Sequence, residues 1–140
     1  GQQRDVLDNV RKAPRYARSP GRPRWWPATW QAYKILRVAG DGTFESPFDG
    51  SSWTLGKRRA QKVGDDAWHG RHSGGFYVYL GPNVLREKFL NRTLLPERCY
   101  TPGTYALLEC ECSGRDVAFP SGKHAVTYCR PVRVMETFTI

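Results

Sequence analysis

The segment TYALLECECS at positions 104–113 constrains the fold of this chain more than any other stretch. Side chains of a β-strand point alternately to its two faces. With that spacing, one face carries an unbroken apolar row and the other carries two apolar residues followed by two glutamates. The two rows are Ala106, Leu108, Cys110 and Cys112, and Tyr105, Leu107, Glu109 and Glu111. The segment is therefore predicted to be a β-strand.

Similar stretches recur on both sides of this segment. The strongest is FYVYL at 76–80, which is dominated by aromatic and β-branched residues that favour strands. Glycine-rich stretches between the strands are typical of hairpin turns. The further predicted strands are 29–38, 53–63 with a kink at Gly56, and 123–140 with Pro131 at an edge or bulge; the predicted hairpin connections are 39–43 and 114–122.

One internal helix is predicted, over PNVLREKFLNRTLL at 82–95. Pro82 suits the first turn of a helix and Pro96 ends it. Four apolar side chains at helical spacing form the stripe that would face a core: Val84, Leu85, Phe89 and Leu94. The fold class is therefore α+β, a mainly antiparallel β-sheet domain with one internal helix.

The first 30 residues differ in character from the rest. Apolar residues at helical spacing predict a short helix at 4–13, and four prolines after it favour an extended arm. A chain of 140 residues corresponds to one domain. We therefore expect a basic N-terminal helix and Pro-rich arm over 1–30 and a single antiparallel-sheet domain over 31–140. No apolar run approaches the length of a membrane span, so none is expected.

Charge points to the class of partner. The chain has 22 Lys and Arg against 13 Asp and Glu, a net charge of +9, and no carboxylate lies between Asn9 and Gly40. Guanidinium groups bind phosphates and carboxylates, and tryptophan rings stack on bases. The residues expected to bind the partner are Arg11, Lys12, Arg15, Arg18, Arg22, Arg24, Trp25, Trp26 and Trp30.

Two kinds of partner fit this arm. One is the backbone of a nucleic acid, RNA in particular, and the other is an acidic and aromatic groove on another protein. A subunit of a larger complex, such as a ribonucleoprotein, accommodates both. We therefore expect a non-catalytic binding or assembly subunit that grips an anionic partner through its N-terminal arm.

The four cysteines allow three disulfide pairings or one zinc site. Cys110 and Cys112 lie on one face of the predicted strand, about 7 Å apart, which is too wide for a tetrahedral metal site. Buried, reduced thiols without metal are the preferred interpretation for Cys99, Cys110, Cys112 and Cys129. Reduced thiols favour an intracellular, reducing compartment, and the Arg-rich composition also suits a protein imported into an organelle.

Other motifs give no positive support for catalysis. His69 and His72, near Asp65 and Asp66, form a weak metal pattern and are interpreted as solvated side chains. The LGKRR stretch at 55–59 lacks the full phosphate-binding loop, and no nucleophile elbow surrounds any serine. No cofactor is therefore expected from the residues themselves.

The order of short motifs over roughly residues 30–136 resembles small uncharacterised domains of phages, giant viruses and actinobacteria. Such domains have a Tyr-Lys strand, a Trp-x-x-Gly, a Gly-(Phe/Leu)-x-Val strand and a final basic strand near Ala-x-Val. The matching stretches are 33–34, 53–56, 75–78 and 123–126.

The same order is also similar to that of ADP-ribosyltransferases. This resemblance implies NAD as cofactor, with Arg37 in the first strand, Tyr77 or Tyr79 stacking on NAD, and Glu111 or Glu136 as the catalytic glutamate. The His-Gly-Thr and Ser-Thr-Ser motifs of that family are absent. The alternative interpretation places the tyrosines on a sheet face and leaves the glutamates solvated or paired with arginine.

The tyrosines give one further expectation. Tyr77 and Tyr79 point to the same face of their strand, whereas the apolar residues between them point to the other. The tyrosine face could meet solvent, the helix at 82–95 or a cleft. We expect Trp25, Trp26 or Trp30 to cover it, leaving no room for a dinucleotide.

Overall fold

A computed structural model describes residues 24–64, 67 and 74–140. The predicted helix at 4–13, most of the predicted arm, and the His69 and His72 loop lie outside the described residues. Seven strands, one α-helix and one short 3-10 helix follow one another in the described part. In chain order they are β1 (Arg24–Gly40), β2 (Thr43–Glu45), β3 (Ser52–Thr54), β4 (Arg59–Ala60), β5 (Phe76–Tyr79), α1 (Pro82–Leu90), η3 (Glu97–Cys99), β6 (Thr104–Ala118) and β7 (Lys123–Thr139).

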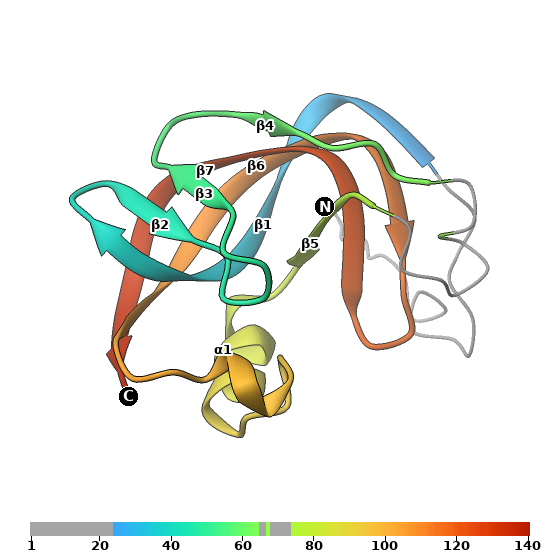
Figure 1. Ribbon diagram of the computed structural model, residues 1–140. Helices are drawn as coiled ribbons and strands as arrows, with labels where there is room; N and C mark the ends of the chain where they lie inside the picture. The colour runs from blue at the N-terminus through green and yellow to red at the C-terminus, as the bar shows by residue number, and fades with distance from the viewer. Residues whose placement is uncertain (1–23, 65–66, 68–73) are drawn as a thin grey trace.

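The strands form one antiparallel sheet, which confirms the predicted fold class. Strand β6 lies between β1 and β7, while β5 pairs with β7 and touches β1 through Tyr33 and Tyr79. The strands β1, β5, β7 and β6 therefore close into a ring. In Figure 1 the long strands curve over β5, and α1 lies at the end of the sheet near the C-terminus.

Strand β1 runs across position 30, where we expected the arm to end. Residues 24–26 pair with the far end of β6, and pairing resumes at Trp30 after a register shift. Pro27 lies within that shift, where its missing N–H breaks no ladder hydrogen bond. The prolines led us to predict an arm here. The local sequence does not reveal the distant strand with which these residues pair.

Two other predicted boundaries are wrong. The strand expected at 53–63 is divided into β3 and β4 by a turn at Gly56, whose φ of 81° suits glycine. Strand β6 continues through most of the hairpin expected at 114–122 and ends at Ala118. A bulge at Gly114, with φ of 84°, lets it continue past a shift of register.

The helix is shorter than predicted and ends at Leu90 rather than position 95. Arg92 adopts a left-handed conformation with φ of 58°, and its N–H bonds the Phe89 carbonyl at 3.1 Å. The Thr93 N–H bonds the Lys88 carbonyl at 2.9 Å. These are the two hydrogen bonds of a Schellman helix end, so the chain reverses before Leu94.

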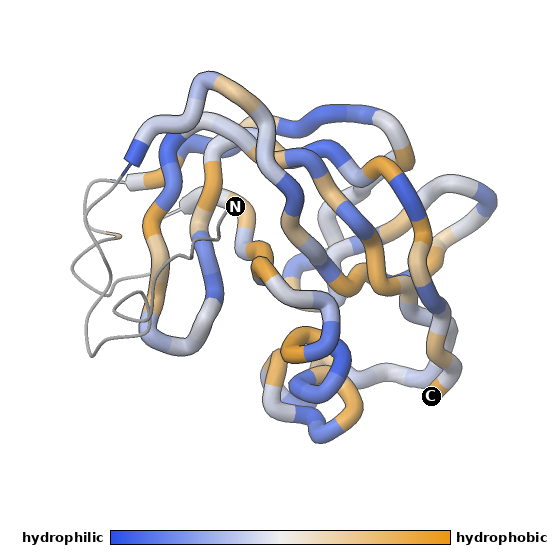
Figure 2. Tube along the Cα trace, turned by 180° about the vertical axis from the view of Figure 1, so that it is seen from behind, coloured by the Kyte–Doolittle hydropathy of each residue, from blue (hydrophilic) through white to orange (hydrophobic). Residues whose placement is uncertain are grey.

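Three apolar clusters fill the molecule, and the alternation predicted for 104–113 separates two of them. The first takes one row of β6, from Ala106 to Cys112, together with Trp53 and Phe76. The second takes Tyr105 and Leu107 from the other row and packs them against the helix. Polar and apolar residues alternate along the long strands in Figure 2. The third cluster lies around Val63, Val117, Phe119 and Ala125.

The tryptophans do not cover the tyrosine face of β5. Tyr79 is buried in the second cluster, against Leu85 and Phe89 of α1. Trp30 instead packs on the first cluster, which holds Phe76 and Val78 from the opposite face of β5. Among the three options for the tyrosine face, the helix is therefore the one that Tyr79 meets.

Candidate functional site

A patch of aromatic and basic residues lies where β1 begins. Trp25 is 63% exposed and is the register partner of Arg115 on β6. Its ring meets the ring of Tyr128 on β7 edge-on, with 6.5 Å between centroids. The guanidinium of Arg58, from the loop before β4, lies 4.5 Å from the Tyr128 ring centre. We call Trp25, Arg58, Arg115 and Tyr128 the basic aromatic patch.

This patch is suited to flat, anionic ligands. An indole that is mostly exposed costs hydrophobic free energy unless a ligand covers it, and its face attracts another ring or a cation. The arginines beside it supply planar donors for phosphate or carboxylate oxygens. Three separate strands and a loop bring these side chains together, so the sheet fixes their spacing.

The end of the sheet next to the patch holds a buried acid and base. His124 Nδ1 lies 2.8 Å from Asp116 Oδ1, and both side chains are about nine-tenths buried. Trp26 Nε1 donates to the other carboxylate oxygen at 3.1 Å. The Trp30 ring meets the His124 ring edge-on at 5.8 Å. Trp26 and Trp30, which we expected to contact a partner, instead turn toward this pair.

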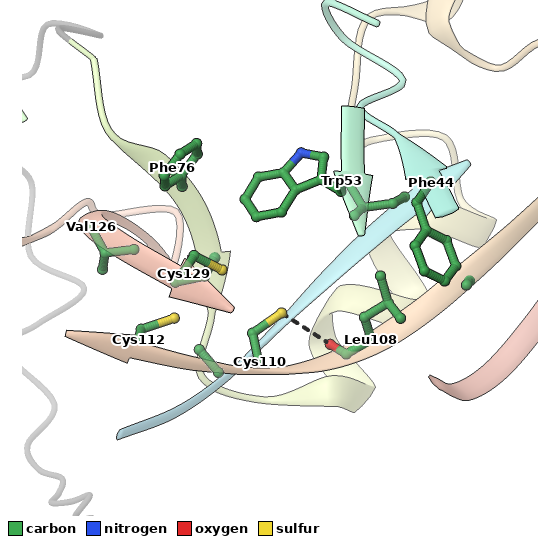
Figure 3. Packing of buried hydrophobic residues seen from close by; sticks show 12 residues of the cluster. Phe44, Trp53, Phe76, Leu108, Cys110, Cys112, Val126 and Cys129 are labelled. Atoms are coloured by element: carbon green, nitrogen blue, oxygen red, sulfur yellow. Dashed lines mark hydrogen bonds between the residues drawn. The ribbon is translucent and has the colours of Figure 1, made fainter. Parts of the chain in front are cut away.

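Three thiols gather in the first cluster. Cys112 and Cys129 are register partners on β6 and β7, and Cys110 lies on the same face of β6. Figure 3 shows their sulfur atoms facing the space beneath Trp53. The Lys34 ammonium lies 5.3 Å from the Trp53 ring centre and donates to the Tyr77 carbonyl at 2.6 Å.

The pKa values of the three thiols are shifted in different directions. Side-chain hydrogen bonding with Cys110 and Cys112 holds the pKa of Cys129 well below the usual thiol range, and the positive charges of Lys34 and Arg59 act in the same direction. The pKa of Cys110 is raised mainly by its hydrogen bonding with Cys129 and secondly by burial. The pKa of Cys112 is raised mainly by burial and secondly by its own hydrogen bonding with Cys129. In the described part of the chain, no three His, Cys, Asp or Glu side chains are arranged to hold a metal ion. The redox state of the cysteines stays a prediction.

These shifts predict a loss of stability in alkali. Above about pH 8.5 the unfolded chain loses thiol protons that Cys110 and Cys112 keep in the fold, so stability falls as pH rises, by up to about 1.4 kcal/mol per pH unit for each thiol. Cys129 acts oppositely: its contribution is complete above that pH and is lost as pH falls through its folded pKa. Urea unfolding between pH 7 and 10 measures the slope.

The matched variants are Cys110→Ala and Val126→Ala. The first should flatten the alkaline slope, because it removes one retained proton. The second removes buried apolar volume from the same cluster but no titratable group, and it should leave the slope unchanged. An alkaline slope that is the same in both variants would contradict the assignment.

The glutamates of β6 are paired with arginines of β7. Glu111 accepts from Arg130 at 2.5 Å, and Glu109 accepts from Arg133 at 2.6 Å. The members of each pair are also register partners, so the sheet holds them opposite each other. This is the arginine-paired arrangement that we gave as the alternative to a catalytic glutamate.

The other residues implied by the ADP-ribosyltransferase resemblance also have partners of their own. Arg37 donates to the Pro102 carbonyl at 2.8 Å, and Glu136 accepts from Arg86 at 2.7 Å. The Tyr77 ring meets Phe119 edge-on at 6.1 Å, while Tyr79 is 8% exposed in the second cluster.

The predicted partner-binding residues fall into three groups. The basic residues at 11, 12, 15, 18 and 22 lie outside the described residues. Trp25 lies in the basic aromatic patch. Arg24, Trp26 and Trp30 lie on β1 at the end that holds Asp116 and His124. Sequence reasoning missed the patch members from β6, β7 and the loop before β4, namely Arg115, Tyr128 and Arg58. It also missed Asp116 and His124, because the hairpin was expected to begin before Asp116.

Comparison of the chain with models of protein families, with curated proteins and with solved structures finds no match. In the described part of the chain, α1 and η3 are both too short to cross a bilayer as helices. Function is therefore inferred from the side chains and their contacts.

Proposed function

We propose that this protein is a basic binding module that holds single-stranded nucleic acid, RNA in particular, on the basic aromatic patch. The observation that carries the proposal is the exposed indole of Trp25 beside Arg115 and the stacked pair of Arg58 and Tyr128. Proteins that bind single strands combine aromatic platforms for bases with cations for the backbone.

The position of the patch in the chain supports the same partner. The patch begins at Trp25, shortly after the stretch that carries five of the predicted basic contacts. A nucleic-acid strand stacked on Trp25 could therefore continue along that stretch. The net charge of +9 adds a long-range attraction for a polyanion.

Fluorescence anisotropy tests the choice of partner. The full chain is titrated into three labelled probes: single-stranded RNA, duplex DNA of the same sequence, and a polyglutamate peptide of matched charge. The proposal predicts tightest binding to the single strand, because only its bases are free to stack on Trp25. Tighter binding to the peptide would indicate that the partner of the patch is an acidic protein. Tighter binding to the duplex would indicate that bases do not stack on Trp25.

The alternative, an enzyme similar to ADP-ribosyltransferases, makes an opposite prediction. NAD at millimolar concentration is expected to leave the melting temperature unchanged, because Tyr79 is packed against α1 and Glu111 is held by Arg130. Differential scanning fluorimetry measures this. A stabilisation that disappears in Glu111→Gln or Glu136→Gln would favour the enzyme.

A further inference from the structure

Two buried ring nitrogens next to the patch have no hydrogen-bond partner among the residues that the structure describes. They are Nε2 of His124 and Nε1 of Trp30. Their rings are in edge-on contact, with 5.8 Å between centroids. Buried polar atoms in native proteins are almost always paired, because an unpaired one has lost its hydrogen bond to water without gaining another. Since the two rings are in contact, one small group lying between the nitrogens would pair both.

The contacts of Asp116 fix which His124 nitrogen carries hydrogen. The carboxylate only accepts, and its two oxygens receive Trp26 Nε1–H at 3.1 Å and His124 Nδ1 at 2.8 Å. Nδ1 must therefore be protonated. In the neutral imidazole Nε2 then has a lone pair and accepts. Asp116 thus orients His124 as the acid of a catalytic triad orients its base.

The two unpaired nitrogens require opposite hydrogen-bonding groups from a ligand. Trp30 Nε1–H can only donate, whereas neutral His124 Nε2 can only accept. A single group that accepts from one and donates to the other is a hydroxyl. We propose that His124 and Trp30 form a binding site for one hydroxyl group, of water or of an alcohol, with His124 placed to act on it as a base.

The same geometry describes the proton transfer. The hydroxyl proton moves to Nε2 and the O–H electron pair stays on the oxygen, which still accepts from Trp30 Nε1–H. The resulting imidazolium is held by the Asp116 carboxylate through Nδ1–H. An inorganic anion would suit this site less well, because Asp116 already supplies a negative charge 2.8 Å from the imidazole.

Nitrogen-15 NMR of the full chain tests the site. The expected result is an Nδ1–H, Nε2 lone-pair tautomer for His124, and a nuclear Overhauser contact between the Trp30 indole proton and a bound hydroxyl. Methanol is the alcohol probe. If it shifts both the Trp30 and His124 signals, the site admits alcohols; if only a water contact is seen, water is the occupant. Both results support the proposal.

Variants separate the role of each residue. Asp116→Asn lets the amide donate to Nδ1 and accept from Trp26, so the imidazole proton should move to Nε2, and His124 should no longer accept the hydroxyl proton. Trp30→Phe should abolish the methanol shift at His124. Trp25→Phe is the matched control, since its ring meets Tyr128, and should change neither signal.

Three results would overturn the proposal. They are an Nε2–H tautomer in the unmodified protein, a methanol response at His124 that survives Trp30→Phe, and the absence of both the water contact and the methanol shift. None of these depends on nucleic-acid binding.

Discussion

Replacement of Phe89 by alanine is expected to lower the free energy of unfolding by about 3–5 kcal/mol. Phe89 is 1% exposed and lies at the centre of the second cluster. Its ring centroid is 5.0 Å from that of Tyr105, 5.5 Å from Tyr100 and 5.6 Å from Phe138. Removal of the ring leaves a cavity among three aromatic side chains, one directly after η3, one on β6 and one on β7, and α1 loses one of its two buried side chains.

The next residue provides the matched control. Leu90 lies in the same helix but is 56% exposed, so Leu90→Ala removes little buried surface and should cost less than about 1 kcal/mol. Urea unfolding followed by circular dichroism measures both variants. A loss for Phe89→Ala no larger than that for Leu90→Ala would mean that α1 does not support the fold.

Replacement of Trp25 by alanine is expected to weaken binding of single-stranded RNA by about 5- to 150-fold, which corresponds to the 1–3 kcal/mol of one stacked base. The ring is 63% exposed and meets the Tyr128 ring edge-on, so the fold should be little affected. Anisotropy gives the affinity, and thermal unfolding shows whether stability is retained.

Phe48 is the control for this variant. It is also an exposed aromatic residue, at 59%, and the Arg98 guanidinium lies 5.7 Å from its ring centre. It belongs to the loop between β2 and β3 and not to the patch. Phe48→Ala should therefore keep full affinity, and equal losses in the two variants would show that any exposed aromatic residue serves as well as the patch.

Local patterns predicted the parts of the fold that depend on nearest neighbours. The period of two at 104–113 correctly separated the row of Ala106 and Leu108 from that of Tyr105 and Leu107, because each face of β6 meets a different cluster. The turn at 39–43 was also correct, since Gly42 has the positive φ, 69°, that such hairpins need.

Features that depend on distant partners could not be predicted. Pro27 argued against a strand in the first part of β1. That part forms because β6 continues far enough to pair with it. His124 and Asp116 approach each other only because β6 passes through the bulge at Gly114. Tyr128 and Arg58 join Trp25 through the sheet, and no motif in the sequence links them.

The salt dependence of RNA binding tests the proposed function most directly. Each phosphate neutralised on a single strand adds about −0.7 to the slope of log affinity against log salt, so the two patch arginines alone predict a slope of about −1.4 or steeper. Arg58→Gln should make it shallower by about 0.7. Arg92→Gln, which removes an equal charge stacked on Tyr100 beside α1, should not. An affinity independent of salt, or the same slope in both variants, would contradict nucleic-acid binding at the basic aromatic patch.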